Sequence, residues 1–297
     1  MHKFAALLIL VIVGTATGAL AKTIPHASLV AESSHNQVSI QSVPVRVTTG
    51  DAPVLVAHGV SAYAVDSTTM TTLYSQNAAM MRPIASLTKI MTVYIILRDH
   101  NLADIVTVGM LPKYGPEDEV LGLVAGEKFS VEQLIRAALV PSDNDAADAL
   151  AIYDSGSILA FTNKMNETLT EWRIHDAHYA SASGLTDENN YASAEALAKI
   201  AKLALTSSSV RSLVATKQTT VTDEAGTFYK VTSSDKLLSP LPFYGIKTGY
   251  TTAAGQCFVG LTTINGHEVI TVVLGSADRF GDSMALRNWI EGAWKWQ

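Results

Sequence analysis

Residues 85–99, ASLTKIMTVYIILRD, constrain the fold most, because their apolar side chains run almost all the way round a helix. A helix without a polar face is stable only where other elements cover it on every side. The segment, predicted helical over 86–98, must therefore be buried within a domain. The chain can supply such a core: it has 297 residues, of which 48% are hydrophobic and 16% charged, as in globular rather than disordered proteins.

Four further segments have helical patterns: 130–139, about 145–154, 194–205 and 284–297. The first begins with Ser130 and Gln133 at the spacing of a capping box, and Ser193 precedes the third. The last is amphipathic and places the following residues on one face: Leu286, Trp289, Ile290 and Ala293.

Strand patterns lie on both sides of these helices. Residues 59–77 contain two alternating runs around the polar turn Asp66-Ser67-Thr68, which predicts a hairpin. Residues 243–250, 256–264 and 267–275 are β-rich, and Asn265-Gly266 is a strong hairpin turn between the last two. The order predicts an α/β arrangement in which strands from both chain ends pair in one antiparallel sheet covered by helices.

The N-terminus has the pattern of a secretory signal peptide, with a short basic start, an apolar core and a small-residue end. Cleavage is expected after Ala21. An uncleaved membrane anchor is the alternative, because the apolar run is near the length that spans a bilayer. Both readings predict an exported protein. Residues 22–52 are polar and without clear period, so we expect a leader or linker there and the folded domain over 53–297.

Charge and cysteine content exclude other classes. The formal net charge is -6 and no cluster of lysine and arginine stands out, so nucleic acid is not an expected partner. Cys257 is the single cysteine, so no disulfide can form within the chain.

Ser86 and Lys89 are three residues apart, so their side chains can meet on one face of the predicted helix. A lysine held in apolar surroundings loses affinity for its proton and can then accept the proton of a serine hydroxyl. The S-x-x-K pattern alone is weak, since about one copy is expected by chance in a chain of this length. Lys89 could instead extend its amine out of the core. A second copy, Ser233 to Lys236, lacks a helical pattern and is assigned no role.

Two tripeptides later in the chain change this weighing: Ser142-Asp143-Asn144 and Lys247-Thr248-Gly249. Each is expected by chance in only ~4% of chains this long. Alone, Ser142 or Asn144 could cap a helix and Lys247 could be an exposed strand residue. In this order, S-x-x-K, S-D-N and K-T-G are typical of class A β-lactamases and penicillin-binding proteins.

Three longer stretches extend the likeness: RPIASLTKIMT, ASGLTDENNYASAEALAKIA and GIKTGYTTAAGQCFVG. With them, residues 59–292 resemble the serine D-alanyl-D-alanine peptidases, the low-molecular-mass penicillin-binding proteins. The resemblance implies a β-lactamase/transpeptidase-like fold, with an antiparallel sheet of about five strands covered by helices and a helical subdomain. It implies peptidoglycan stem peptides ending in D-Ala-D-Ala as substrate, β-lactam antibiotics as covalent inhibitors, and a place in the periplasm or on the cell-wall side of the membrane. No metal or organic cofactor is expected.

Acyl transfer assigns a role to each motif residue. Ser86 is the expected nucleophile, Lys89 the general base and Ser142 a proton relay to the leaving amine. Substrate binding is expected from the remaining positions. Asn144 would bind the peptide backbone, Lys247 and Thr248 a carboxylate, and Gly249 would let the substrate lie close to the strand. Backbone N–H groups of Ser86 and, by resemblance, Tyr250 would form the oxyanion hole. The resemblance also suggests Arg279 for the terminal carboxylate, although its offset from the last strand differs from the usual pattern.

The prediction is a carboxypeptidase that releases terminal D-alanine, and the alternatives stay open. An endopeptidase that cleaves crosslinks shares all three motifs. A class A-like β-lactamase would need a glutamate-activated water, usually in E-x-x-L-N, and neither Glu167 nor Glu171 begins that pattern. A non-catalytic module that binds the cell wall is a further reading.

Two other interpretations are weaker. A zinc peptidase could use His175, Asp176 and His178, but H-E-x-x-H is absent and a third ligand is not evident. An α/β-hydrolase would need G-x-S-x-G, which the sequence lacks. The terminal helix with Trp294 and Trp296 is expected to pack on the sheet, with peripheral association with a membrane surface as the alternative.

Overall fold

The computed structural model describes residues 42–48, 51–54, 60–185, 188–238 and 242–297. The predicted signal peptide or anchor and the leader as far as residue 41 lie outside the described residues. Ser42–Gln297 forms one compact unit. Within the described ranges, no helix is both long and apolar enough to cross a membrane.

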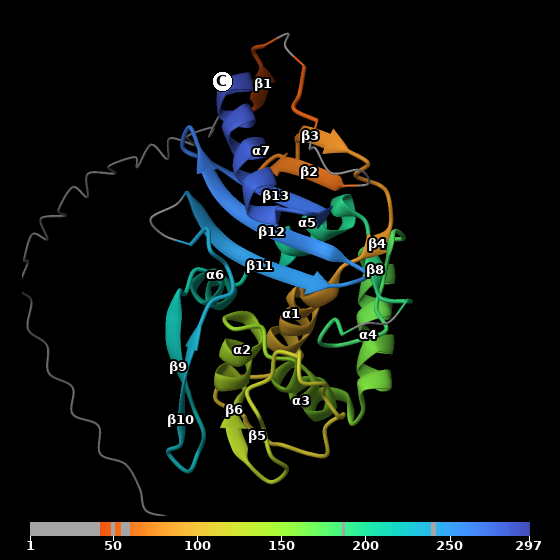
Figure 1. The fold of residues 1–297 in the computed structure, drawn as a ribbon, viewed down its shortest axis with the longest axis vertical. Helices are drawn as coiled ribbons and strands as arrows, with labels where there is room; N and C mark the ends of the chain where they lie inside the picture. Colours follow the sequence, from red (N-terminus) through yellow and green to blue (C-terminus); the bar gives the residue numbers. More distant parts are fainter. Residues whose placement is uncertain (1–41, 49–50, 55–59, 186–187, 239–241) are drawn as a thin grey trace, which may run out of the picture. The chain divides into compact units, whose positions relative to one another are not determined.

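A five-stranded antiparallel sheet crosses the unit in the order β11-β12-β13-β2-β3 (Figure 1). Its strands come from both ends of the unit: β2 (Ser61–Asp66), β3 (Thr72–Gln76), β11 (Phe243–Thr251), β12 (Gly255–Ile264) and β13 (His267–Ser276). Asn265 and Gly266 both have positive φ, as a tight turn between β12 and β13 requires. The predicted fold class, hairpins and sheet are confirmed.

Helices cover both faces of this sheet. Successive side chains of β13 point to opposite faces of the sheet. One set lies toward α5 (Ala194–Ala204) and the other toward α7 (Arg279–Ala293).

 Ile270, Val272 and Leu274 belong to the core on the α5 side, whereas Val269 and Val273 pack in the core that contains Leu286 of α7. Both faces of the strand are therefore buried, which explains its nearly continuous run of apolar residues.

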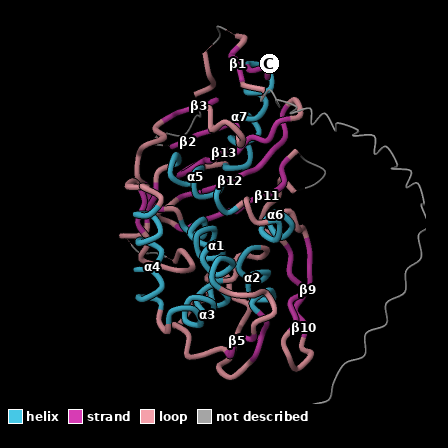
Figure 2. Tube along the Cα trace, turned by 180° about the vertical axis from the view of Figure 1, so that it is seen from behind, coloured by secondary structure: helices cyan, strands magenta, loops and turns pink. Residues whose placement is uncertain are grey.

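The helical subdomain lies beside the β11 edge of the sheet (Figures 1 and 2). It contains the helices α1 (Lys89–Asp99), α2 (Val131–Leu139), α3 (Asn144–Ser155) and α4 (Ile158–Glu171). The hydroxyl of Ser130 accepts a hydrogen bond from the backbone N–H of Gln133 and so caps α2, as the sequence predicts. Ser193 caps α5 in the same way.

The first helix differs from its prediction at the start. Residues Ala85–Thr88 form a 3-10 turn, η1, and the α-helix begins only at Lys89. Side chains three residues apart eclipse one another in a 3-10 turn. The correction therefore strengthens the expected contact between Ser86 and Lys89.

The remaining elements are short. Helix α6 (Ser208–Val214) lies near β11, and the other strands form small sheets: β1 (Pro44–Arg46), β4 (Arg82–Pro83), β5 (Ile105–Thr107), β6 (Lys128–Ser130), β7 (Ala177–His178), β8 (Tyr191–Ala192), β9 (Gln218–Thr222), β10 (Phe228–Thr232) and β14 (Trp294–Trp296).

The C-terminal prediction of a helix over 284–297 is wrong at both ends. Helix α7 starts at Arg279, after Asp278 caps it through the N–H of Gly281, and it ends at Ala293. The next three residues form β14, which pairs with β1. Trp294 and Trp296 pack against the α7-side core, as expected, but from a strand. Ordered structure therefore also includes residues 44–46, within the segment predicted to be linker.

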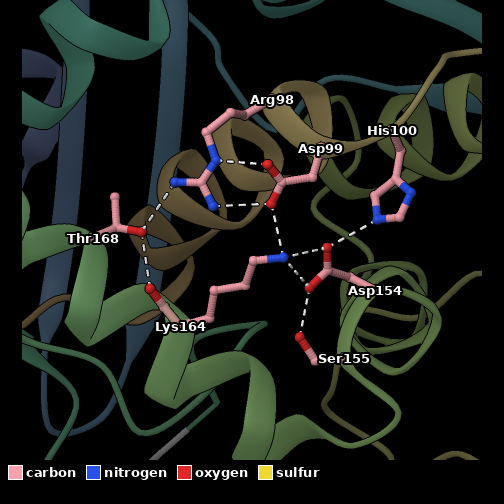
Figure 3. A network of polar contacts seen from close by, with 7 residues as sticks. All are labelled: Arg98, Asp99, His100, Asp154, Ser155, Lys164 and Thr168. Carbon is pink, nitrogen blue, oxygen red and sulfur yellow. Dashed lines mark hydrogen bonds and ion pairs between the residues drawn. The ribbon is translucent and has the colours of Figure 1, made fainter.

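A network of charged side chains joins the C-terminal ends of α1 and α3 to α4 (Figure 3). The amine of Lys164 on α4 lies 2.7 Å from a carboxylate oxygen of Asp99 and 2.8 Å from one of Asp154. Arg98 also pairs with Asp99, and His100 pairs with Asp154. The network links the two helices that carry Lys89 and Asn144 at their other ends.

Candidate active site

Ser86 and Lys89 form the centre of the candidate site. The η1 turn places Ser86 at the end of the buried α1 helix, and Lys89 is the first residue of that helix. The Lys89 amine Nζ lies 2.8 Å from the Ser86 hydroxyl oxygen. The sequence-predicted pair is thus in direct hydrogen-bond contact.

Two further groups hold the Lys89 amine, and both are uncharged. Nζ donates to the side-chain oxygen of Asn144 and to the backbone carbonyl of Ser183, each at 2.7 Å. The Lys89 side chain is fully buried. Burial lowers its pKa to about 7, and the nearby charge of Lys247 lowers it too, against the raising effect of Asp148 and other acids. At neutral pH a substantial share of Lys89 is therefore the free amine.

Lys247 lies buried on β11 and donates a 3.2 Å hydrogen bond to the carbonyl of Thr248. Burial lowers the pKa of Lys247 to about 8, and the positive charge of Arg279 adds to this effect. Lys247 therefore keeps most of its charge at neutral pH. Two buried lysines with different charge states are the arrangement that a base and an electrostatic anchor need.

Ser142 and Asp143 connect α2 to α3 beneath this pair. Ser142 has a φ of 86°, a region that side chains other than glycine seldom adopt. Its hydroxyl is buried and, among the described residues, has no hydrogen-bond partner. Burial raises the pKa of Asp143 to about 7, with Asp145 adding to the shift. A strained backbone and an unsatisfied hydroxyl next to Asn144 are features of a functional segment.

A cleft of about 280 Å³ opens above Ser86. It lies between the helical subdomain and the β11 edge, and its walls come from seven separate parts of the chain. The lining residues are Ser86, Glu117, Asp118, Glu119, Asn144, Gly184, Leu185, Ser234, Thr248, Gly249, Tyr250, Thr251, Thr252 and Arg279.

Polar groups gather on the β11 wall of the cleft. The hydroxyls of Ser234 and Thr248 lie 2.5 Å apart. The Arg279 guanidinium donates to the carbonyl of Gly249 at 2.7 Å and stays close to the cleft. Hydroxyls beside a guanidinium provide donors for a carboxylate. Arg279 therefore lines the cleft, and its role in binding a carboxylate stays a prediction.

Two glycines allow the nucleophile turn to approach its neighbours. Ala85 has a φ of 49°, and its carbonyl would lie 2.1 Å from a Cβ added at Gly184. A Cβ at Gly249 would lie 3.0 Å from the carbonyl of Ile84 and 3.2 Å from the Ser86 nitrogen. The absent side chain of Gly249 therefore makes room for the Ser86 turn. That it also lets the substrate lie close to the strand stays a prediction.

The structure brings all three motifs to one place, and it adds groups that the sequence interpretation missed. These are the carbonyl of Ser183, the close approach of Gly184 and the hydroxyl of Ser234. The stretch ASGLT was noted for its likeness but given no role. Ser234 lies inside the second S-x-x-K, whose own Ser233 hydroxyl only accepts from the Asp235 backbone.

The alternative residues lie elsewhere. Asp176 bonds to the Ser193 hydroxyl, and His178 bonds to the carbonyl of Asn189. Within the described residues, no three histidine, cysteine or acidic side chains are grouped to hold a metal. Glu167 and Glu171 are exposed on α4 and do not line the cleft.

Comparison with known proteins agrees with this geometry. The profile of the family described as D-alanyl-D-alanine carboxypeptidase matches residues 47–278. The chain belongs to this family. The family and its relatives establish a serine peptidase, and solved relatives share the β-lactamase/transpeptidase-like fold of this chain.

The match with this chain covers a different share of each relative's length. The D-alanyl-D-alanine carboxypeptidase of a Streptomyces species is 34% identical over 77% of this chain and 86% of its own. A D-alanyl-D-alanine endopeptidase of Escherichia coli is 30% identical over 78% of this chain and 76% of its own. For the carboxypeptidase DacF of Bacillus subtilis the identity is 28%, and the match spans 57% of that protein.

Solved structures share the fold. A Streptomyces DD-transpeptidase superposes with a TM-score of 0.74 at 31% identity, over 82% of this chain and all of the other. An ampicillin-bound penicillin-binding protein from Listeria monocytogenes gives a TM-score of 0.66 at 28% identity, over 77% of this chain and 96% of the other.

Proposed function

We propose that the chain is an exported serine D-alanyl-D-alanine carboxypeptidase that acts on peptidoglycan stem peptides through an acyl-enzyme on Ser86. The observation that carries the proposal is the 2.8 Å contact between the Ser86 hydroxyl and a fully buried Lys89 amine. The family of the chain and the names of its relatives support the substrate class.

The neutral Lys89 amine takes the proton of Ser86 as the hydroxyl oxygen attacks the carbonyl between the two D-alanines. The backbone N–H groups of Ser86 and Tyr250 stabilise the oxyanion. Ser142 relays a proton to the leaving nitrogen, which departs as free D-alanine. Water then adds to the acyl-enzyme, its proton passes to the base, and Ser86 is regenerated.

The β11 wall binds the C-terminal carboxylate of the peptide in this proposal. Thr248, Ser234 and Arg279 supply the donors, and Lys247 supplies positive charge from beneath. The Asn144 side chain, which holds Lys89 through its oxygen, has an amide nitrogen left for the substrate backbone.

Penicillin would acylate the same serine and remain bound for a long time. Rapid release of the drug needs a carboxylate that activates water, usually in E-x-x-L-N. Glu167 and Glu171 lie outside the cleft, and the acids that line it, at 117–119, do not belong to that pattern. The ampicillin-bound relative supports this part of the proposal.

Cleavage of crosslinks is the second candidate. The match covers 86% of the Streptomyces carboxypeptidase and 76% of the Escherichia coli endopeptidase, so the extent of similarity does not separate the two activities. The reaction at Ser86 is the same in both cases and water is the final acyl acceptor in both. Only the leaving amine differs: free D-alanine for the carboxypeptidase and the amine of a second stem peptide for the endopeptidase.

Digestion of purified peptidoglycan with product identification by mass spectrometry tests the proposal. Free D-alanine from pentapeptide stems is the expected result, and monomers released from crosslinked dimers would instead establish the endopeptidase. Ser86→Ala should lose both peptide cleavage and labelling by fluorescent penicillin. A Ser86→Ala protein that still cleaves would overturn the mechanism, and rapid hydrolysis of penicillin would favour a β-lactamase.

A further inference from the structure

Asp148 is a buried acid that the proposed reaction does not use. It lies on α3 one helical turn after Asn144, so both side chains are on the same face of the helix. Asp148 is 3% exposed. A carboxylate so thoroughly buried is costly unless hydrogen bonds satisfy it, so its partners identify what it does.

The phenol of Tyr114 donates to the Asp148 carboxylate at 2.8 Å. The side chain of Ser183 acts on the same carboxylate and lowers its pKa, against the larger raising effect of burial. The backbone carbonyl of Ser183 holds the Lys89 amine at 2.7 Å. Asp148 is thus one residue removed from the catalytic base.

Ser183 lies in a tightly fixed loop. The hydroxyl of Ser181 accepts from the N–H of Gly184, and Gly184 packs against the backbone of Ala85. A shift of Ser183 would therefore move both the carbonyl on Lys89 and the support beneath the nucleophile turn.

Tyr114 connects the same carboxylate to the rim of the cleft. It belongs to the segment between β5 and β6, which also carries the cleft residues Glu117, Asp118 and Glu119. The carbonyl of Glu119 accepts from the N–H of Asn144 at 2.7 Å. The rim segment is thus attached to the start of α3 at Asn144 and, one turn further along the helix, at Asp148.

We propose that Asp148 is a positioning residue for the acyl-transfer reaction: by holding Ser183 and Tyr114 together, it fixes the carbonyl that orients the Lys89 amine and joins the rim of the cleft to it. Burial raises the pKa of Asp148 to about 6, so at neutral pH it is mainly a carboxylate that accepts the Tyr114 hydroxyl proton. The inference rests on the proposed function of Ser86 and Lys89.

Asp148→Ala and Asp148→Asn separate the hydrogen-bond bridge from the charge. The asparagine can still accept from Tyr114 and donate to the Ser183 oxygen, whereas alanine keeps neither bond. The acylation rate constant and the dissociation constant of the initial complex are measured separately by stopped flow with a fluorescent penicillin.

We expect Asp148→Ala to acylate about 10–100-fold more slowly with little change in initial binding, because misplacing a base costs rate rather than affinity. Asp148→Asn should recover to within about 5-fold of the wild type. Equal rates for the alanine variant and the wild type would overturn the proposal. So would an asparagine variant as slow as alanine.

Asp154→Asn is the matched control. Asp154 is also a buried acid on α3, but it lies at the far end in the network of Lys164. This variant should lower the melting temperature without slowing acylation. If the control slowed acylation as much as Asp148→Ala, helix destabilisation would account for both and the proposal would fail. Absence of labelling in the wild type would instead refute the function itself.

Discussion

Lys89 and Lys164 belong to the same helical subdomain and have opposite surroundings. Lys89 is fully buried, its partners are uncharged, and burial lowers its pKa to about 7. Lys164 has a 30% exposed side chain beside two carboxylates. Its partial burial opposes the charge, but the hydrogen bonds that it donates to Asp154 and Asp99 raise its pKa overall. The comparison shows how one residue type serves as a base where it lacks counter-ions and as a structural link where it has them.

Helix position adds to this contrast. Lys89 is the first residue of α1, where the helix dipole disfavours a positive charge. Asp99 and Asp154 lie at the C-terminal ends of α1 and α3, where the dipole disfavours a negative charge, and Lys164 and Arg98 offset that cost. The charge without a counter-ion, that of Lys89, therefore lies at the cleft, whereas the charges at the opposite helix ends are paired.

The sharpest way to break the comparison is to exchange each lysine for methionine. Lys89→Met should lower the acylation rate constant by about 10²–10⁴-fold, since general-base catalysis is lost. Fluorescent-penicillin labelling measures this effect. A variant that retains the wild-type rate would show that another group takes the Ser86 proton.

The same variant tests the charge state of Lys89 through stability. Its pKa is about 7 in the folded protein and 10.5 as the ordinary value, so the unfolded chain binds more protons between these values. The wild type therefore gains stability as pH rises through this window. The stability of Lys89→Met relative to wild type should be most favourable near pH 7 and decline toward pH 10, as melting temperatures can show. A pH-independent difference would contradict a buried, weakly basic Lys89.

Gly184 and Gly156 extend the comparison to the backbone. Both have positive φ, at 86° and 76°, and Gly156 directly follows the Asp154 end of α3. A Cβ at Gly184 would clash with the Ala85 carbonyl, whereas one at Gly156 would meet nothing within 4 Å. Gly184→Ala should slow acylation by about 10²-fold.

Gly156→Ala is the control for this prediction. It should cost about 1–2 kcal/mol in stability from backbone strain alone and leave acylation unchanged. Chemical denaturation measures the first effect and penicillin labelling the second. Equal acylation by the two variants would show that the Ala85 contact does not position Ser86.

The pH dependence of peptide cleavage tests the protonation states assigned to Lys89 and Lys247. Loss of activity on the acid side should follow protonation of Lys89, with a pKa of about 7, and loss on the alkaline side should follow deprotonation of Lys247, with a pKa of about 8. We expect a narrow bell-shaped profile of kcat/KM between these values. A flat profile from pH 6 to 9 would contradict the assignment of the two lysines.

The smallest effect on catalysis should come from Lys164→Met. Removing this amine leaves Asp154, which is 1% exposed, with only its hydrogen bonds to His100 and Ser155. We expect a loss of about 1–3 kcal/mol in unfolding free energy and a kcat/KM within about 3-fold of the wild type. Urea denaturation and peptide assays provide the two values, and a large fall in kcat/KM would show that the two regions are coupled.

Sequence patterns predicted most of the sheet because side-chain alternation and turn residues are encoded locally. The strands around Asn265-Gly266 and the cap at Ser130 follow from such signals. The pairing of β14 with β1 joins residues that are almost as far apart in the sequence as the unit allows. In addition, Trp294–Trp296 continue the apolar helical periodicity of the preceding residues. Local periodicity therefore placed the end of α7 too late.

The candidate site was predictable where side chains carry the chemistry. Ser86, Lys89 and Asn144 meet as their motifs suggest. The carbonyl of Ser183 has no signature in sequence, because every residue has a backbone carbonyl. Ser234 and Asp148 were not predicted either, since their roles depend on which neighbours the fold brings to them.

The pairing of β1 with β14 also has a topological consequence. The backbone N–H of Val43 lies 3.0 Å from the carbonyl oxygen of Gln297, so the two ends of the compact unit are adjacent. A short peptide can bridge them, and the chain can be opened instead in the turn at 223–226, at the tip of the β9–β10 hairpin. Such a circular permutant would keep every strand of the central sheet in its present neighbourhood.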